Sequence, residues 1–61
     1  MIRIELTDED ASRLRELCET ELSDLRMEIA DTDSMDFRDR LKRDARLLRA
    51  VIEQLTAARV A

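Results

Sequence analysis

The stretch Leu22–Phe37, LSDLRMEIADTDSMDF, decides the fold of this 61-residue chain. Its first half has the three- and four-residue apolar spacing of a helix, and its middle gathers aspartates around a Thr and a Ser. If one helix ran unbroken through residues 31–36, the apolar stripe that follows would be rotated about 100° from the stripe that precedes it. We therefore predict a break at residues 31–34, which lets the two stripes face each other in a helical hairpin.

The aspartates in this stretch also raise the question of a calcium-binding loop. Asp31 and Asp33 have the spacing that opens such a loop, which next needs an oxygen ligand, a Gly and a bidentate Glu. The residues that stand at those three positions are Met35, Asp36 and Lys42. The pattern therefore favours a turn in which Asp33 or Ser34 caps the second helix.

Two apolar stripes define the expected helices. Thr7 is the expected N-cap of the first helix, because Asp10 follows three residues later and an acidic first turn suits the helix dipole. The apolar face of this helix consists of Ala11, Leu14, Cys18, Leu22, Leu25 and Ile29. The apolar face of the second consists of Phe37, Leu41, Ala45, Leu48, Val51, Ile52, Leu55 and Ala58. Cys18, at the centre of the first stripe, is predicted to be a small core residue.

The predicted organisation is one all-α domain over residues 1–61, an antiparallel two-helix hairpin. Its parts are an extended N-terminal segment at 1–7, a helix at 8–30, a turn at 31–34 and a helix at 35–58. Apolar and polar residues alternate in the first segment, as in a strand with one buried face. This segment either tucks its apolar side chains under the helices or pairs with the same segment of a second copy.

Composition supports an all-α fold and excludes several kinds of site. The chain has no Gly, Pro, Trp or Tyr, and tight turns in strand-rich folds favour Gly and Pro. One Cys and no His exclude an internal disulfide and a zinc site of the usual ligands within one chain. A core in so short a chain is marginal, so self-association is the stabiliser that remains.

Leu17, Leu47 and Ala50 lie off the two main stripes and, together with other apolar residues nearby, predict a homodimer. If the stripes face each other, Leu17 and Leu47 fall on the same side of the hairpin. Two hairpins could bury such a surface by forming a four-helix bundle. The predicted dimer surface consists of Leu6, Leu17, Leu47, Ala50, Val51 and Ala58.

A stripe of carboxylates is the one pattern that raises the question of metal chemistry. Its members are Glu21, Asp24, Glu28 and Asp31, on one flank of the first helix. Facing pairs of this kind hold magnesium in all-helical nucleotide pyrophosphatases, but the same spacing is common in any charged helix. We expect a solvated network with Arg40 and Arg43, and we predict no catalytic, cofactor-binding or metal-binding residue.

Asp44 stands between Leu41 and Leu48 in the second apolar stripe, where a carboxylate is unusual. A buried carboxylate must be paired or protonated, and Arg15 and Arg26 are candidate partners. Three interpretations stay open. The helices splay and the group stays wet, or it forms an ion pair that fixes the helix register, or it is a buried polar centre with a function.

The charge balance argues against a protein built mainly to bind nucleic acid. The net charge is −4, and Phe37 is the only aromatic residue available to stack on a base. A basic side of the second helix is expected to be a solubilising face, with the binding of a partner protein or of nucleic acid as the alternatives. It consists of Arg38, Lys42, Arg46 and Arg49. The chain has no apolar run that could cross a membrane and no signal core, which predicts a cytoplasmic protein.

The segment from Ser23 to Ser34, SDLRMEIADTDS, resembles a group of short bacterial helical-hairpin proteins of unassigned function. The resemblance covers roughly residues 2–55 and implies a bacterial, stand-alone small protein, with no activity or cofactor to carry over. The predicted function is therefore a dimeric, non-catalytic protein–protein interaction or regulatory module.

Two other functions remain as alternatives. The first is a ribbon-helix-helix DNA-binding antitoxin or repressor, in which Arg3 and Glu5 would enter the major groove. Three features argue against this alternative. The first helix expected here is about twice as long as in that family, the turn lacks the Gly that the family usually has, and the net charge is negative. The more remote alternative is a carboxylate-bundle, metal-dependent nucleotide hydrolase.

Overall fold

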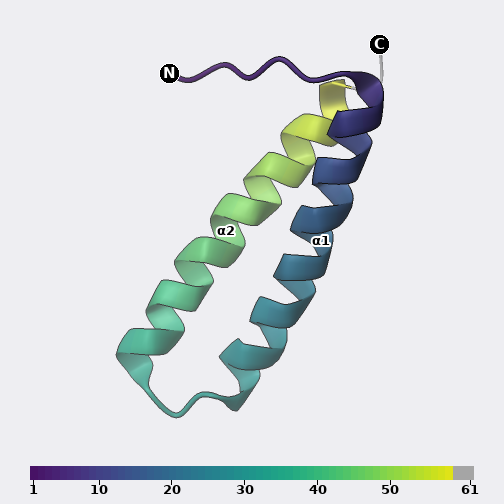
Figure 1. Cartoon of the computed structure of the whole chain (residues 1–61). Coiled ribbons are helices and arrows are strands. Elements are labelled where there is room, and N and C mark those ends of the chain that lie inside the picture. Colours follow the sequence, from purple (N-terminus) through teal and green to yellow (C-terminus); the bar gives the residue numbers. More distant parts are fainter. Residues whose placement is uncertain (59–61) are drawn as a thin grey trace.

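Two long α-helices run antiparallel in the computed structural model and pack against each other along their length (Figure 1). Helix α1 spans Asp8–Asp31 and helix α2 spans Met35–Ala58. The structure describes residues 1–58, and residues 59–61 of the predicted domain lie outside the described residues. The predicted helical hairpin is confirmed, and α1 ends one residue later than predicted.

Helix α1 begins at Asp8 because Thr7 caps it. Thr7 has extended backbone angles, φ −68° and ψ 162°, and its Oγ1 accepts a hydrogen bond from the backbone N–H of Asp10 at 3.1 Å. This bond satisfies one of the N–H groups that a helix start leaves unpaired. The first turn is acidic and complements the positive end of the helix dipole, as the sequence predicts.

The connection at residues 32–34 is a turn that closes one helix and starts the next. The backbone N–H of Thr32 donates to the Glu28 carbonyl at 3.0 Å, which ends α1. The Ser34 hydroxyl oxygen accepts from the Phe37 backbone N–H at 3.3 Å, so Ser34 caps α2, as one of the two predicted residues. The Arg38 side chain then reaches back and donates through Nη2 to the Thr32 carbonyl at 2.6 Å.

The core lies in the part of the hairpin nearer this connection. The buried side chains are Cys18, Leu22, Leu25, Leu41 and Ala45. Ile29, Leu48 and Ile52 pack against the last four of them and are half-buried. Each fully buried Leu stabilises the fold by about 1.5–3 kcal/mol, so this cluster accounts for much of the stability of one hairpin. Cys18 is a free, buried thiol, as predicted for a core residue.

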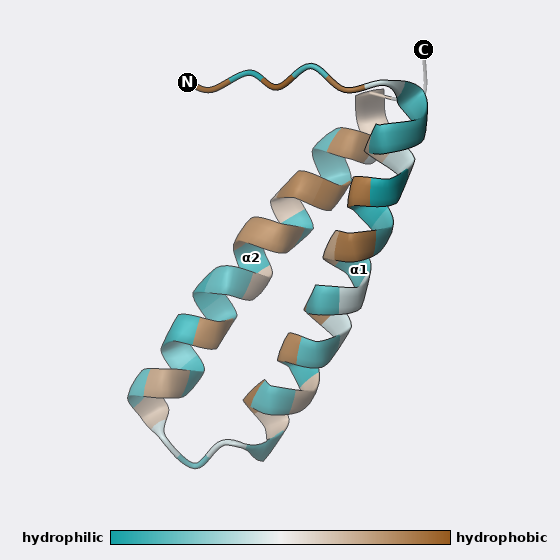
Figure 2. Cartoon of the chain, in the orientation of Figure 1, coloured by the Kyte–Doolittle hydropathy of each residue, from teal (hydrophilic) through white to brown (hydrophobic). Residues whose placement is uncertain are grey.

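The N-terminal segment, residues 1–7, is extended and leaves the hairpin at its open end, where the helices are not joined (Figure 1). Apolar and polar residues alternate along it (Figure 2). The expectation that its apolar side chains tuck under the helices is wrong, because Ile2 is 92% exposed and Ile4 72% exposed. One hairpin offers this segment no strand to pair with, and pairing with a second copy stays a prediction.

Candidate functional site

Asp44, predicted as a candidate buried polar centre, is exposed in the single hairpin. Among residues 1–58, no charged or polar residue is buried and no ion pair involves Asp44. Asp44 lies about 60° around α2 from Leu41, at the edge of the apolar face. A single partner helix covers a stripe about 100° wide, so the edge stays wet. This agrees with the first of the three interpretations, in which the group stays wet; a single hairpin does not provide the burial that the other two require.

The carboxylate stripe on α1 is also fully exposed to water. Glu21, Asp24, Glu28 and Asp31 are all exposed, and within the described part of the chain no three metal-ligand side chains come together. The ion pairs among residues 1–58 are Arg13–Glu16 at 3.2 Å and Arg15–Glu19 at 2.8 Å, both within α1, and neither involves a residue of the stripe. The expected network of the stripe with Arg40 and Arg43 is not among them.

The predicted dimer surface is uncovered at the open end of the hairpin. The exposed fraction is 41% for Leu6, 52% for Leu17 and 64% for Leu47. Ala50 and Ala58 are exposed as well, and Val51 is half-buried. Residues 1–58 of a single hairpin leave five of these six side chains exposed, so the surface is available for a contact with another molecule.

This surface continues into a groove beside the N-terminal segment. The groove has a volume of about 260 Å³. It is lined by Ile2, Ile4, Leu6, Leu14, Val51, Gln54 and Leu55, from the segment and both helices. Six of these seven residues are apolar, and two of them, Leu6 and Val51, belong to the predicted dimer surface. The open end therefore joins the dimer surface and the N-terminal segment into one apolar region.

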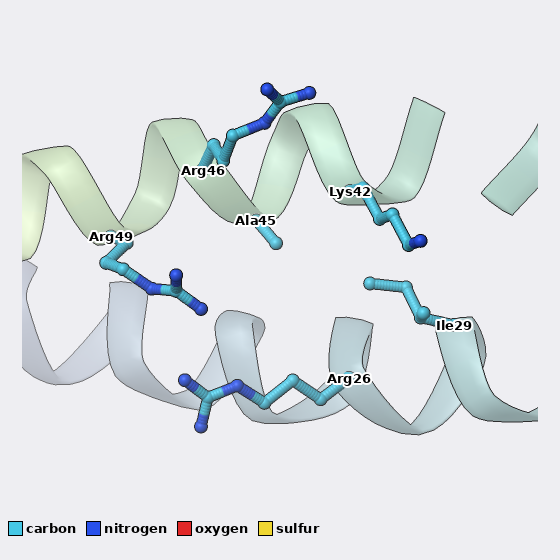
Figure 3. Close-up of a pocket in the computed structure, with 6 residues that line it drawn as sticks. All are labelled: Arg26, Ile29, Lys42, Ala45, Arg46 and Arg49. Carbon is cyan, nitrogen blue, oxygen red and sulfur yellow. The ribbon is translucent and has the colours of Figure 1, made fainter. Parts of the chain in front are cut away.

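A second groove, with basic walls, runs between the two helices nearer the connection. It has a volume of about 490 Å³ and is open to solvent. Arg26 of α1 and cationic residues of α2 line it, with Ile29 and Ala45 between the helices; Lys42 and Arg49 extend toward α1, whereas Arg46 extends away from α1 at the outer rim (Figure 3). The cationic residues from α2 are Lys42, Arg46 and Arg49. The side chains of Arg26 and Arg49 extend toward the same part of the groove (Figure 3).

The four cations of this basic groove lack carboxylate partners in the described part of the chain. Neither ion pair formed by residues 1–58 includes any of the four. Glu53 stands one turn beyond Arg49 on α2, yet it forms no ion pair with Arg49 there. A chain of net charge −4 thus lines one groove with four cations that form no ion pair within residues 1–58.

The basic groove and the apolar surface lie on opposite faces of the hairpin. On α1, Arg26 lies about 80° to one side of the direction in which Cys18 points, and Leu17 lies about 100° to the other. On α2, Arg49 and Leu47 diverge in the same way from the direction of Leu41. A molecule covering one face therefore leaves the other open.

The sequence identified the basic side of α2 but did not place Arg26 beside it. Arg26 was expected only as a candidate partner of Asp44. The signal was present, because in an antiparallel hairpin the same angular side of both helices forms one face, and Arg26 and Arg49 share it. Arg38 belongs to the predicted basic side, but its side chain turns to the Thr32 carbonyl and does not line the groove.

Comparison with known proteins gives no assignment. No family model matches the chain, and neither the curated proteins nor the solved structures contain a significant match. The resemblance of residues 23–34 to short bacterial proteins therefore stays a prediction. Neither α1 nor α2, over the described residues, combines the length and apolar character needed to cross a lipid bilayer.

Proposed function

We propose that this chain is a non-catalytic, homodimeric protein–protein interaction module of the cytoplasm. In this proposal two hairpins pack through their apolar surfaces into a four-helix bundle, and the remaining charged faces meet a larger partner. The observation that carries the proposal is the apolar region at the open end, from Ile4 and Leu6 to Leu17 and Leu47. Connected apolar surfaces of this kind mark contact sites in soluble proteins.

The surface area of the whole chain supports association. The chain exposes 5396 Å² for a mass of 7.1 kDa. A compact monomer of that mass exposes roughly 4,100 Å², so this hairpin shows roughly 1,300 Å² more than a self-sufficient monomer would. A standard protein interface covers roughly 800 Å² on each partner. The excess is therefore large enough to accommodate one such interface.

The oligomeric mass of matched charge variants tests the proposal. We expect wild-type protein at micromolar concentration to show the mass of a dimer in light scattering coupled to size-exclusion chromatography. Leu47→Glu places a carboxylate in the proposed interface and should give a monomer. Glu is a good helix former, so the variant should keep its helical circular dichroism.

Met27→Glu is the matched control. Met27 is 60% exposed, close to the 64% of Leu47, but it lies on the side of α1 that points away from α2. This variant should remain a dimer. A wild-type monomer at micromolar concentration, or equal dissociation by both variants, would overturn the proposed dimer surface.

A ribbon-helix-helix DNA-binding dimer is a second candidate, supported by one observation. Residues 1–7 are extended and unpaired, as the ribbon of such a protein would be before dimerisation. The length of α1, 24 residues, argues against it. Duplex DNA binding at low salt that is lost in Arg3→Ala and kept in Arg43→Ala would support this candidate. The absence of binding to a random-sequence duplex pool at low salt would remove it.

A further inference from the structure

We propose that the basic groove between α1 and α2 binds an acidic amphipathic helix of a partner protein. This inference rests on the proposed function, because it names the chemistry of the partner that the module would meet. The groove lies within one hairpin and faces away from the apolar surface, so it stays open in the proposed dimer. Each dimer would then carry two such grooves.

Charge complementarity is the first argument for an anionic ligand. Arg26 and Arg49 come from different helices and extend toward the same part of the groove (Figure 3). Two like charges brought together without a carboxylate repel each other, and an anion between them relieves that repulsion. A guanidinium group matches the two oxygens of a carboxylate, so one carboxylate could bridge the pair.

The floor of the groove indicates that the ligand also carries apolar groups. Ile29 and Ala45 lie between the cationic walls, and Ala45 leaves space because its side chain is a single methyl group. An ion held only by charge would leave the exposed part of Ile29 in contact with water. Leu or Ile side chains on the same face of a ligand helix would cover it.

The spacing of the cations indicates a helix. Lys42, Arg46 and Arg49 follow one another at four- and three-residue steps along α2, over about 10 Å or two turns. Carboxylates at the same steps on a helix lying over the groove could meet Lys42 and Arg49, which extend toward α1, and reach Arg46 at the outer rim (Figure 3). The expected ligand therefore has Glu or Asp at three- and four-residue steps, with apolar residues beside them.

Nucleic acid fits this groove less well. Base recognition outside a duplex relies on aromatic stacking, and the only aromatic residue, Phe37, does not line the groove. The net charge of −4 also repels a long polyanion at low salt. A single-stranded oligonucleotide is therefore the competing ligand to include in the test.

Fluorescence anisotropy with a designed peptide tests the proposal on the full chain. The probe is a labelled helical peptide of about four turns, with Glu and Leu on one face at the spacing given above. We expect it to bind wild-type protein, and to bind the double variant Arg26→Ala/Arg49→Ala at least about tenfold more weakly. Both residues are exposed, so circular dichroism should show an unchanged fold.

Two matched controls separate the groove from general charge. The double variant Arg40→Ala/Arg43→Ala removes the same number of charges from exposed positions outside the groove, and should weaken peptide binding by less than about threefold. A scrambled peptide of equal charge but without an apolar face should bind the wild type at least about tenfold more weakly.

Several results would overturn the proposal. The first is that the peptide does not bind at millimolar concentration, and the second is that both double variants lose the same amount of peptide affinity. The third is that the scrambled peptide binds as tightly as the designed one. The fourth is that an oligonucleotide binds in the groove more tightly than the peptide.

Repeating the titration with Leu47→Glu separates the two proposals. Groove-dependent binding to a monomeric hairpin supports the groove whatever the outcome for the dimer.

Discussion

The two ends of the hairpin differ in how much of their apolar surface the fold itself covers. All five buried side chains lie between Cys18 and Ala45, on the side of the connection. At the open end, residues 1–17 and 46–58 contain no buried side chain, although Leu14, Leu48 and Leu55 are half-buried. Both ends are built from the same two helices, so the difference between them lies in how the side chains pack and not in the type of secondary structure.

The comparison shows how much apolar surface of one helix a single partner helix can cover. Near the connection, the chain holds the helices together covalently, and Leu and Ala interdigitate across one narrow seam. At the open end, apolar residues spread beyond that seam to Leu17 and Leu47, which a single partner helix cannot reach. The connection end is thus a small finished core, whereas the open end would become half of a larger core only in the proposed dimer.

The largest expected effect is a core truncation near the connection. Leu25 is 6% exposed, and Leu25→Ala should lower the free energy of unfolding by about 2–4 kcal/mol through lost burial and a cavity. A domain of this size has only about 3–5 kcal/mol in its core, so the variant should lose most of its helical signal. Urea unfolding followed by circular dichroism measures the change.

The matched change at the open end is Leu17→Ala, made in the Leu47→Glu background so that dimerisation does not contribute. Leu17 is 52% exposed, and we expect a loss below about 1 kcal/mol. Equal losses of unfolding free energy for Leu25→Ala and Leu17→Ala would show that the fold covers the apolar surface of both ends equally, which would contradict the difference between them.

Removing the charged donor beside the connection should have an intermediate effect. Arg38→Met keeps an apolar chain of similar length but deletes the hydrogen bond to the Thr32 carbonyl. Hydrogen bonds from charged groups contribute about 1.5–3 kcal/mol when buried, and Arg38 is half-buried, so we expect a loss of about 1–2 kcal/mol. Thermal unfolding measures it, with the exposed Arg40→Met as the control, expected to change stability by less than about 0.5 kcal/mol.

The smallest effects compare the two helix caps. Ser34→Ala should lower stability by about 1 kcal/mol, because this cap starts α2 beside the core. Thr7→Ala should lower it by about 0.5 kcal/mol, since the first turns of α1 can fray without disturbing a buried side chain. Hydrogen exchange should show faster exchange confined to the first turn of α1 in Thr7→Ala. Exchange that rises throughout both helices would contradict this.

The sequence predicted the fold closely because the signals are local. Thr7 with Asp10 marks the start of α1, and the change of phase across residues 31–34 requires a break. The core of each helix follows from three- and four-residue spacing, which depends on no distant residue. The bond from Arg38 to Thr32 was not predicted, because it depends on the path of the turn and not on a pattern of residue types.

The candidate sites were harder to predict because they depend on how the helices pair. Asp44 and Arg26 both lie at the edges of apolar stripes, and the sequence left open whether they pair. The structure puts them on opposite faces, since Asp44 lies on the Leu47 side of α2 and Arg26 faces Arg49. An edge residue has two environments available, and only the register of the pairing decides between them.

The position of the core beside the connection also bears on the order of folding. Leu25 and Leu41 each lie within about two turns of the short link at residues 32–34, so their contact closes a short loop at a small entropic cost. We expect the hairpin to nucleate there and zip toward the open end, with relaxation in the microsecond to millisecond range typical of local helical contacts. The surface offered to a second copy would then be the last part of the chain to form.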